Sequence, residues 1–212
     1  MARCEALFDA IVDGKIADAQ TLVGERLAAG EAPMDIIAGT LIPAMDEVGQ
    51  LFQDEEYFVP ELMMSGRAMK AAMAPLRPLL AAAGAVPAGV VVAGTVKGDL
   101  HDIGKNLVIS MLEGSGFKVI DLGTDVTPAR FVDAIRTHQP NILCLSALLT
   151  VTMLAMKSTI EAITAAGLRD SIKIMVGGAP VHEKFARDIG ADGYGVTATD
   201  AVSVARDLVS VA

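Results

Sequence analysis

The sequence predicts an α/β protein in two parts: an N-terminal four-helix bundle, then a five-stranded parallel sheet with helices on both faces. Apolar residues recur at helical spacing over roughly the first 85 residues. From Val90 onward, short continuous apolar runs alternate with helical patterns, and this alternation is typical of a parallel sheet covered by helices. A chain of 212 residues, 52% of them hydrophobic, can bury the cores that this architecture needs.

The first part contains four segments with helical periodicity. The segments are residues 4–14, 16–30, 32–52 and 60–80. In the first segment Leu7, Phe8 and Ile11 fall on one face of a helix, and the second segment repeats this spacing. Pro43 lies inside the third segment and predicts a kink or break, whereas Pro60 opens the fourth segment, where proline is favoured. Short connections between four such helices favour a small bundle.

The second part contains five apolar runs of strand length, each followed by a helical pattern. The runs cover residues 89–95, 117–123, 141–148, 172–178 and 191–196. The helical patterns cover residues 103–114, 128–138, 151–166, 181–189 and about 199–210. Continuous apolar runs are typical of strands buried on both faces. We therefore expect a flavodoxin-like or Rossmann-like sheet, with a linker at 81–89 between a helical domain, 1–85, and an α/β domain, 89–212.

The composition excludes several classes of protein. A net charge of −9 at pH 7 is the opposite of what a nucleic-acid-binding surface needs. Cys4 and Cys144 are far apart and give no disulfide or zinc framework, and Cys144 sits in an apolar run as a small core residue. The N-terminal segment lacks the apolar core of a signal peptide, and no apolar run is long enough to span a membrane. We expect a cytoplasmic globular protein.

Small and polar residues gather where the predicted strands end. In an open parallel sheet, ligands bind at the carboxyl ends of the strands. These positions hold Gly, Ser, Thr, Asp and one histidine, His101, but only two lysines, Lys97 and Lys105. Neither a Walker loop nor a dinucleotide-binding fingerprint is present. A phosphorylated ligand would therefore be held mainly by backbone N–H groups and hydroxyls.

His101 has the surroundings of a metal ligand. Asp99 lies two residues before it, so on a loop the two side chains point to the same side and the carboxylate can orient the imidazole. Ser146, at the end of the third strand, could support Asp99 if the first and third strands are neighbours. One histidine is too few for a zinc or iron site built from protein side chains, so a cofactor would supply the other ligands. A plain polar residue at a strand end is the alternative, and the lack of a G-x-S-x-G elbow argues against a hydrolase.

Three separated elements of this part resemble the signature D-x-H-x-x-G … S-x-L … G-G. The elements here are Asp99, His101 and Gly104, then Ser146 and Leu148, then Gly177 and Gly178. That signature belongs to domains that bind cobalamin base-off and His-on. Residues 41–69 also resemble the helical cap that precedes such domains. The chain thus resembles the corrinoid proteins of methylamine, methanol and methoxy-aromatic methyltransferase systems, and the cobalamin module of methionine synthase.

The resemblance implies a role for each residue of the signature. His101 would replace the dimethylbenzimidazole base as the lower axial ligand of cobalt, with Asp99 and Ser146 forming a relay behind it. The displaced nucleotide tail would enter a slot beside Gly104, because glycine permits close backbone approach. Asp102 stays open between a helix cap and a cofactor contact, and no side chain is expected to be catalytic. The expected cofactor-binding residues are Asp99, His101, Asp102, Ile103, Gly104, Ser146, Leu148, Thr150, Gly177 and Gly178.

By the same resemblance, the helical domain would cover the upper face of the corrin. The candidates to shield a bound methyl group are Phe52, Tyr57, Phe58, Leu62 and Met63. Ordinary core packing is the alternative for each of them, and it is the default for the methionine-rich stretch at 62–73.

The function implied by the resemblance is that of a methyl carrier, not of an enzyme active alone. Cob(I)alamin would take a methyl group on a substrate-specific methyltransferase, and methylcobalamin would pass it on at an acceptor methyltransferase. A reductive activase is a further expected partner. A mutase subunit and a cobalamin-dependent sensor are the alternatives. Mutases lack the helical cap and need a substrate barrel, and a sensor usually adds a DNA-binding module, for which this acidic chain offers no basic helix.

Overall fold

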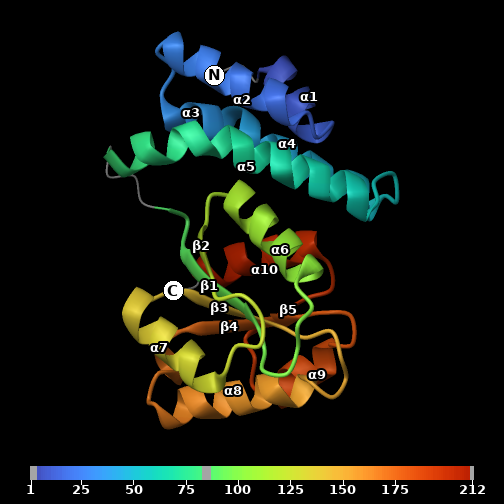
Figure 1. Ribbon diagram of the computed structural model, residues 1–212, viewed down its shortest axis with the longest axis vertical. Helices are drawn as coiled ribbons and strands as arrows, with labels where there is room; N and C mark the ends of the chain where they lie inside the picture. The colour runs from blue at the N-terminus through green and yellow to red at the C-terminus, as the bar shows by residue number, and fades with distance from the viewer. Residues whose placement is uncertain (1–3, 83–86, 211–212) are drawn as a thin grey trace. The chain divides into compact units, whose positions relative to one another are not determined.

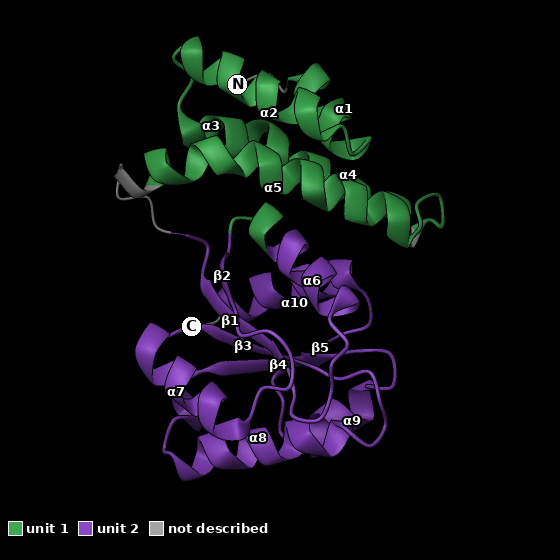
Figure 2. Ribbon diagram, viewed as in Figure 1, with its two compact units in different colours: residues 1–86, 113–116 green, residues 87–112, 117–212 purple. Residues whose placement is uncertain are grey.

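The computed structural model describes residues 4–82 and 87–210, which form two compact units (Figures 1 and 2). The first unit comprises residues 1–86 with 113–116, and the second comprises 87–112 with 117–212. Each unit is described by itself below. Residues 83–86 of the predicted linker lie outside the described residues.

The helical unit follows the predicted order of segments. Its elements are α1 (Glu5–Val12), α2 (Ile16–Ala28), α3 (Pro33–Ile36), a π-helical turn (Ile37–Leu41), α4 (Ile42–Gln53) and α5 (Val59–Ala82). The predicted third helix is therefore interrupted by the π-helical turn, which ends just before Pro43. A proline has no N–H to donate to the preceding turn, so the regular hydrogen-bond ladder is broken there. The predicted break is confirmed.

The end of α1 packs closely on α5. The carbonyl oxygen of Val12 accepts hydrogen bonds from Ser65 Oγ at 2.7 Å and Tyr57 Oη at 3.2 Å. Gly14 has a φ of +67°, and a Cβ built on it would lie 2.6 Å from Met64 Cβ. Only glycine permits both this backbone conformation and this approach. The predicted core positions Leu7 and Ile11 have no exposed surface.

The second unit is a five-stranded sheet in which all paired strands are parallel, as predicted. Its strands are β1 (Val90–Thr95), β2 (Lys118–Asp121), β3 (Ile142–Ser146), β4 (Lys173–Gly177) and β5 (Gly193–Gly195). Their order is β2-β1-β3-β4-β5, the flavodoxin-like order in which β1 and β3 are neighbours. Ser146 pairs with Thr95 on one side and Gly177 on the other. Three adjacent strands therefore end at the same level.

Helices cover both faces of this sheet. They are α6 (Ile103–Gly114), α7 (Pro128–His138), α8 (Met153–Ala165), α9 (Glu183–Asp188) and α10 (Ala198–Ser210), with a 3₁₀ turn at Arg169–Ser171. Helices α7, α8 and α9 lie on one face, and α6 and α10 lie on the other (Figure 1). The predicted architecture is confirmed.

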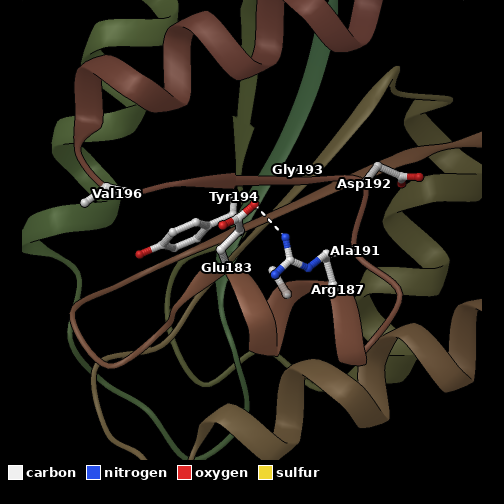
Figure 3. Close-up of a pocket in the computed structure, with 8 residues that line it drawn as sticks. Glu183, Arg187, Ala191, Asp192, Gly193, Tyr194 and Val196 are labelled. Atoms are coloured by element: carbon white, nitrogen blue, oxygen red, sulfur yellow. Dashed lines mark hydrogen bonds and ion pairs between the residues drawn. The ribbon is translucent and has the colours of Figure 1, made fainter.

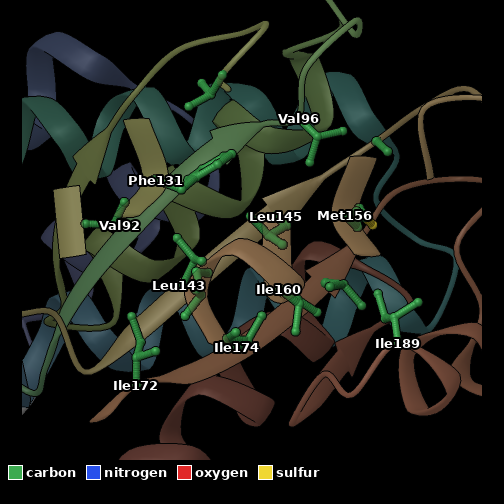
Figure 4. Packing of buried hydrophobic residues seen from close by; sticks show 14 of the residues in the cluster. Val92, Val96, Phe131, Leu143, Leu145, Met156, Ile160, Ile172, Ile174 and Ile189 are labelled. Atoms are coloured by element: carbon green, nitrogen blue, oxygen red, sulfur yellow. The ribbon is translucent and has the colours of Figure 1, made fainter. Parts of the chain in front are cut away.

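The main core of the second unit lies between the sheet and helices α7 to α9. Leu143, Leu145 and Ile174 point from the strands towards Phe131 of α7 and Ile160 of α8 (Figure 4). Alternate residues face the other helices, among them Cys144, whose burial raises the pKa of its thiol to about 12. This cysteine is a packing residue, as predicted. Within residues 4–82 and 87–210, no helix is both long and apolar enough to cross a membrane.

Candidate functional site

The loop after β1 is fixed by hydrogen bonds from two neighbouring segments. Thr95 is fully buried, and its hydroxyl donates to the carbonyl of His101 at 2.9 Å. Asp125, from the loop after β2, accepts the N–H of Gly98 with its carboxylate at 2.8 Å and donates its own N–H to the carbonyl of Asp99 at 3.0 Å. The loop backbone is therefore held from both sides, which places the side chains of Asp99 and His101 reproducibly.

Asp99 and His101 form the predicted pair. Asp99 Oδ1 lies 2.7 Å from Nδ1 of His101 and accepts the backbone N–H of the same residue at 3.1 Å. The Asp99 side chain has no exposed surface, whereas that of His101 is 50% exposed. This bond assigns the proton to Nδ1, so Nε2 carries the lone pair, and Nε2 makes no hydrogen bond to any residue that the structure describes. A half-exposed, oriented imidazole nitrogen suits a metal supplied from outside the chain.

The second oxygen of Asp99 is held by the segment after β3. Oδ2 accepts the backbone N–H groups of Leu148 at 2.8 Å and Leu149 at 3.3 Å, and the hydroxyl of Thr152 at 2.6 Å. Burial alone would raise the pKa of the Asp99 carboxyl, but the hydrogen bonds from Thr152, Leu148 and His101 outweigh it and hold that pKa well below its usual range. Asp99 is therefore a buried carboxylate that accepts hydrogen bonds in its charged form.

The predicted relay between Asp99 and Ser146 is wrong in its second member. Ser146 is half-buried at the end of β3, and its hydroxyl makes no hydrogen bond within the described parts of the chain. The hydroxyl that reaches Asp99 belongs to Thr152, which the sequence analysis did not select as a site residue. The available signal was its position: a threonine immediately before a helix that starts at the ligand-binding edge of the sheet.

Lys105 is not available for an anionic ligand. It is only 5% exposed, and its Nζ donates to Asp121 Oδ1 at 2.7 Å and to Asn106 Oδ1 at 2.8 Å. The side chain of Asn106 in turn donates to the carboxylate of Asp102 at 3.0 Å. Asp102 thus supports the first turn of α6 through a side chain. This polar chain joins α6 to the end of β2.

The glycines of the signature meet different surroundings. Gly178 has a φ of +125°, and a Cβ there would lie 1.9 Å from the carbonyl oxygen of Ala147, so the loops after β3 and β4 touch through backbone alone. Gly104 is exposed, and a Cβ on it would meet nothing within 4 Å. Gly104 therefore leaves open space at the start of α6, beside the loop of His101.

Apolar side chains surround this edge of the sheet. The exposed large hydrophobic residues described in the second unit are Leu100, Ile103, Leu148, Leu149, Val151, Leu154 and Val196. All of them follow the ends of β1, β3 or β5. The sequence pointed to Ile103 and Leu148 but missed the others, because exposure at a strand end gives no signal in the residue pattern. Exposed apolar residues gathered around one oriented imidazole fit a large, mostly apolar metal complex.

Within the described residues, a metal at His101 would take its other ligands from a cofactor. Among the residues that the structure describes, no group of three or more His, Cys, Asp or Glu side chains is placed to hold a metal ion. His182 lies after β4, where its ring nitrogen accepts the N–H of Phe185 at 3.2 Å. The residues present therefore match a metal that brings its own equatorial ligands.

The helical unit places the five cap candidates differently. Phe58 is 62% exposed, whereas Leu62 has no exposed surface. Tyr57 is tied to α1 through its hydroxyl, and Phe52 and Met63 are half-buried. Phe58 thus has the most surface to offer a ligand, and the shielding role of all five stays a prediction.

A surface pocket of about 370 Å³ lies beside β5 and contains none of the predicted site residues (Figure 3). Its lining includes Tyr194 and the ion pair between Glu183 and Arg187, both of which are well exposed on α9. The hydroxyl of Tyr194 donates to the carbonyl of Val181 at 2.8 Å. The pocket shares no lining residue with the loop of His101, and no histidine lines it.

Comparison with known proteins identifies the family of this chain. Two family models, both described as B12 binding domains, match residues 89–203 and 3–77. A dimethylamine corrinoid protein of Methanosarcina barkeri is 41% identical over 207 residues, covering 97% of this chain and 97% of that protein. A solved cobalamin-binding protein of Desulfitobacterium hafniense DCB-2 matches with a TM-score of 0.80 at 34% identity, covering 96% of this chain and 97% of that one.

A chain of the methanol:cobalamin methyltransferase complex of Methanosarcina barkeri matches with a TM-score of 0.83 at 31% identity, covering 97% of this chain and 78% of its own length. The relatives therefore span the whole chain, both the helical unit and the sheet. The resemblance predicted from the three-part signature is confirmed, and its cofactor is a cobalamin-type corrinoid. The chain belongs to the corrinoid proteins of methyltransferase systems.

Proposed function

We propose that this chain binds cobalamin base-off and His-on, with Nε2 of His101 as the lower axial ligand of cobalt, and carries a methyl group between two partner enzymes. One observation carries the ligand assignment: the imidazole is 50% exposed, while its Nδ1 is tied to a carboxylate with no exposed surface. This geometry fixes one tautomer and turns the lone pair of Nε2 outward. A bound corrinoid supplies a cobalt centre that can accept and release a methyl group.

The protein's own residues would bind and orient this cofactor. Asp99 holds the imidazole and stabilises the charge it acquires on a metal. Gly104 leaves room at the start of α6, and Gly178 lets the next loop approach by backbone alone, which suits a slot for the displaced nucleotide tail. Leu148 and Ile103 offer exposed apolar surface after the ends of β3 and β1. Asp102, Thr150, Ser146 and Gly177 remain proposed contacts of the tail or the corrin.

The partners follow from the chemistry of a carrier. A protein that only holds a methyl group needs one enzyme that loads it and another that unloads it. We propose a substrate-specific methyltransferase and an acceptor methyltransferase, with a reductase that restores cobalt after accidental oxidation. A chain of this fold in the methanol:cobalamin methyltransferase complex supports the first of these partners.

Absorption spectroscopy tests the ligand assignment. The purified full chain is mixed with hydroxocobalamin, passed over a desalting column, and its spectrum compared with that of free cofactor. We expect retention of cofactor with the base displaced and a histidine nitrogen on cobalt. His101→Ala should lose the nitrogen ligand, and His138→Ala, which changes an exposed histidine at the end of α7, is the matched control. Failure of the wild-type chain to retain the cofactor, or an unchanged spectrum for His101→Ala, would rule out the assignment.

A further inference from the structure

We infer that Asp125, in the loop after β2, is a positioning residue that fixes the loop of Asp99 and His101 from the side away from β3. The inference rests on the proposed role of His101 and brings a third segment of the chain to that site. It is carried by two hydrogen bonds from one residue. Asp125 Oδ1 accepts the N–H of Gly98 at 2.8 Å, and the N–H of Asp125 donates to the carbonyl of Asp99 at 3.0 Å.

These two bonds fix the main chain on both sides of Asp99. Asp125 ties the peptide group that contains the N–H of Gly98 and the peptide group that contains the carbonyl of Asp99. The peptide group between them is tied by a turn, in which the N–H of Asp99 donates to the carbonyl of Val96 at 3.1 Å. Only the φ and ψ angles of Gly98 and Asp99 separate these three planar groups. The direction of the Asp99 side chain is therefore set by the main chain, and Asp125 holds two of its three fixed points.

Asp125 is itself anchored to the end of β1. Before it, the carbonyl of Gly123 accepts the N–H of Thr95 at 3.0 Å, and after it, the N–H of Val126 donates to the carbonyl of Thr95 at 3.0 Å. Val126 is fully buried and forms a parallel bridge with Val96. Asp125 is thus held on both sides by the strand that precedes the loop, so its contacts keep that loop in one place relative to the sheet.

The backbone conformation of Asp125 indicates that its side chain has a task. Its φ is +52°, in the left-handed region that glycine adopts at less cost. Two other non-glycine residues of the described ranges have a positive φ, Glu55 and Gln139, and both lie within two residues of the end of a helix, where this conformation is common. Asp125 follows no helix. A glycine would suit its backbone better but could not accept the N–H of Gly98.

Amide hydrogen exchange in the cofactor-free chain tests the positioning. The N–H of His101 donates to Asp99 Oδ1 at 3.1 Å, so its exchange rate reports whether Asp99 is in place. Asp125→Gly removes the carboxylate and relieves the backbone. Because Asp125 is exposed and water competes for its bond, we expect a moderate effect: about fivefold faster exchange at both Gly98 and His101, the equivalent of one hydrogen bond. The midpoint of urea unfolding should keep its wild-type value, since the relieved backbone offsets the lost bond.

Asp125→Asn is the conservative variant. Its side-chain oxygen can still accept the N–H of Gly98, and asparagine tolerates the left-handed conformation, so wild-type exchange rates should return. Faster exchange at Gly98 alone in Asp125→Gly, or equally fast exchange at His101 in Asp125→Asn, would overturn the inference. An Asp125→Gly chain that does not fold would also overturn it, because Asp125 would then serve the fold as a whole.

Asp192→Ala is the matched control. Asp192 directly precedes β5, at the opposite edge of the sheet, and its Oδ2 accepts the N–H of Ile174 at 2.7 Å. It is thus another aspartate whose carboxylate holds a backbone N–H. Its loss should lower the midpoint of urea unfolding and leave the exchange of the His101 amide unchanged. A rise at His101 as large as that in Asp125→Gly would show that any loss of stability loosens the loop, and would contradict a specific role of Asp125.

A second readout follows the cofactor. In the cob(II)alamin-loaded chain, electron paramagnetic resonance reports whether a histidine nitrogen binds cobalt. Asp125→Gly should lower the ratio of His-on to His-off cobalt about fivefold, whereas Asp125→Asn and Asp192→Ala should keep the wild-type ratio. The two proposals fail separately, because amide exchange is measured without cobalamin. A wild-type chain that retains no cobalamin, or retains it without a histidine nitrogen, overturns the proposed function alone. A His101 amide or a His-on ratio that is unchanged in Asp125→Gly overturns this inference alone.

Discussion

Two ion pairs at the same edge of the sheet have mirror-image burial. In the first, the acid Asp99 has no exposed surface and its partner His101 is 50% exposed; in the second, the base Lys105 is 3% exposed and its partner Asp121 is 41% exposed. Both pairs are 2.7 Å long. The outer member of the first pair keeps an unused nitrogen lone pair. The outer member of the second uses the same oxygen for Lys105 and for the N–H of Gly123.

If His101 has its proposed role, this difference separates a ligand-binding pair from a structural one. A buried carboxylate pushes electron density towards an imidazole that is free to bind a metal. The buried ammonium of Lys105 joins α6 to β2. Its partner Asp121 can offer a ligand only a solvated carboxylate oxygen. Equal distances and similar exposures therefore do not imply equal roles. The chemistry of the exposed member determines whether an ion pair can bind a ligand.

Asp99→Asn should have the largest effect on stability. The substitution removes a buried charge that accepts five hydrogen bonds. It also places an NH₂ group, itself a donor, opposite groups that donate hydrogen bonds. We expect a loss of about 3 kcal/mol in the free energy of unfolding, the range for breaking a buried ionic network. Urea unfolding of the cofactor-free chain measures it. A loss below about 1 kcal/mol, the net value of one ordinary hydrogen bond, would show that the buried pair is not a tight unit.

The stability of the cofactor-free chain should depend on acidic pH through Asp99. Because the pKa of Asp99 is lowered in the folded chain, its contribution is fully present above the ordinary aspartate pKa and is lost as the pH falls below about 4. Over that window the wild-type advantage over Asp99→Asn should shrink by about 1.4 kcal/mol per pH unit. Paired urea titrations at several acidic pH values measure it, and an advantage that stays constant would contradict the assignment.

Lys105→Met should cost less than Asp99→Asn. The methionine keeps most of the buried stem, and the orphaned Asp121 carboxylate is exposed enough to be hydrated. We expect a loss of about 1 kcal/mol, that of a hydrogen bond whose surviving partner meets water. Retention of hydroxocobalamin should be unchanged. A loss of cofactor binding equal to that of His101→Ala would place Lys105 in the site.

His101→Ala should have the smallest effect on the stability of the cofactor-free chain. The ring is half in solvent, and water can replace its donor at Asp99 Oδ1, so we expect a loss of about 0.5 kcal/mol. Thermal unfolding with and without hydroxocobalamin measures it. The wild-type chain should gain stability from the cofactor, and the variant should gain less.

Local patterns predicted most of the fold and half of the site. Four strands were visible as short apolar runs and the fifth as a weaker run at 191–196, and the pair of Asp99 and His101 was visible because both lie on one short loop. Thr152 was not visible, since it lies 53 residues from Asp99 and the two meet only through the registration of β1 on β3. Ser146 was the nearer choice along β3, but its hydroxyl makes no hydrogen bond to Asp99 within the described residues.

The same limit applies to the apolar edge. Leu100 stands alone in a polar loop and Val151 follows an apolar run, so neither periodicity nor composition distinguishes them as exposed residues. Their common position becomes evident only when the loops after β1 and β3 are brought to one edge. The sequence patterns indicated contacts within segments but not contacts between distant segments.

The exposed leucines and valines at this edge also affect whether the purified protein self-associates in solution. In the proposed complex a corrinoid would cover these side chains, whereas two empty chains could associate through them. The net charge of −9 opposes that encounter, because like-charged molecules repel at a distance. Salt weakens this repulsion. The cofactor-free chain should therefore aggregate as the ionic strength rises, and bound corrinoid should prevent this aggregation. Light scattering would then report how much of the protein carries cofactor, without an absorption measurement.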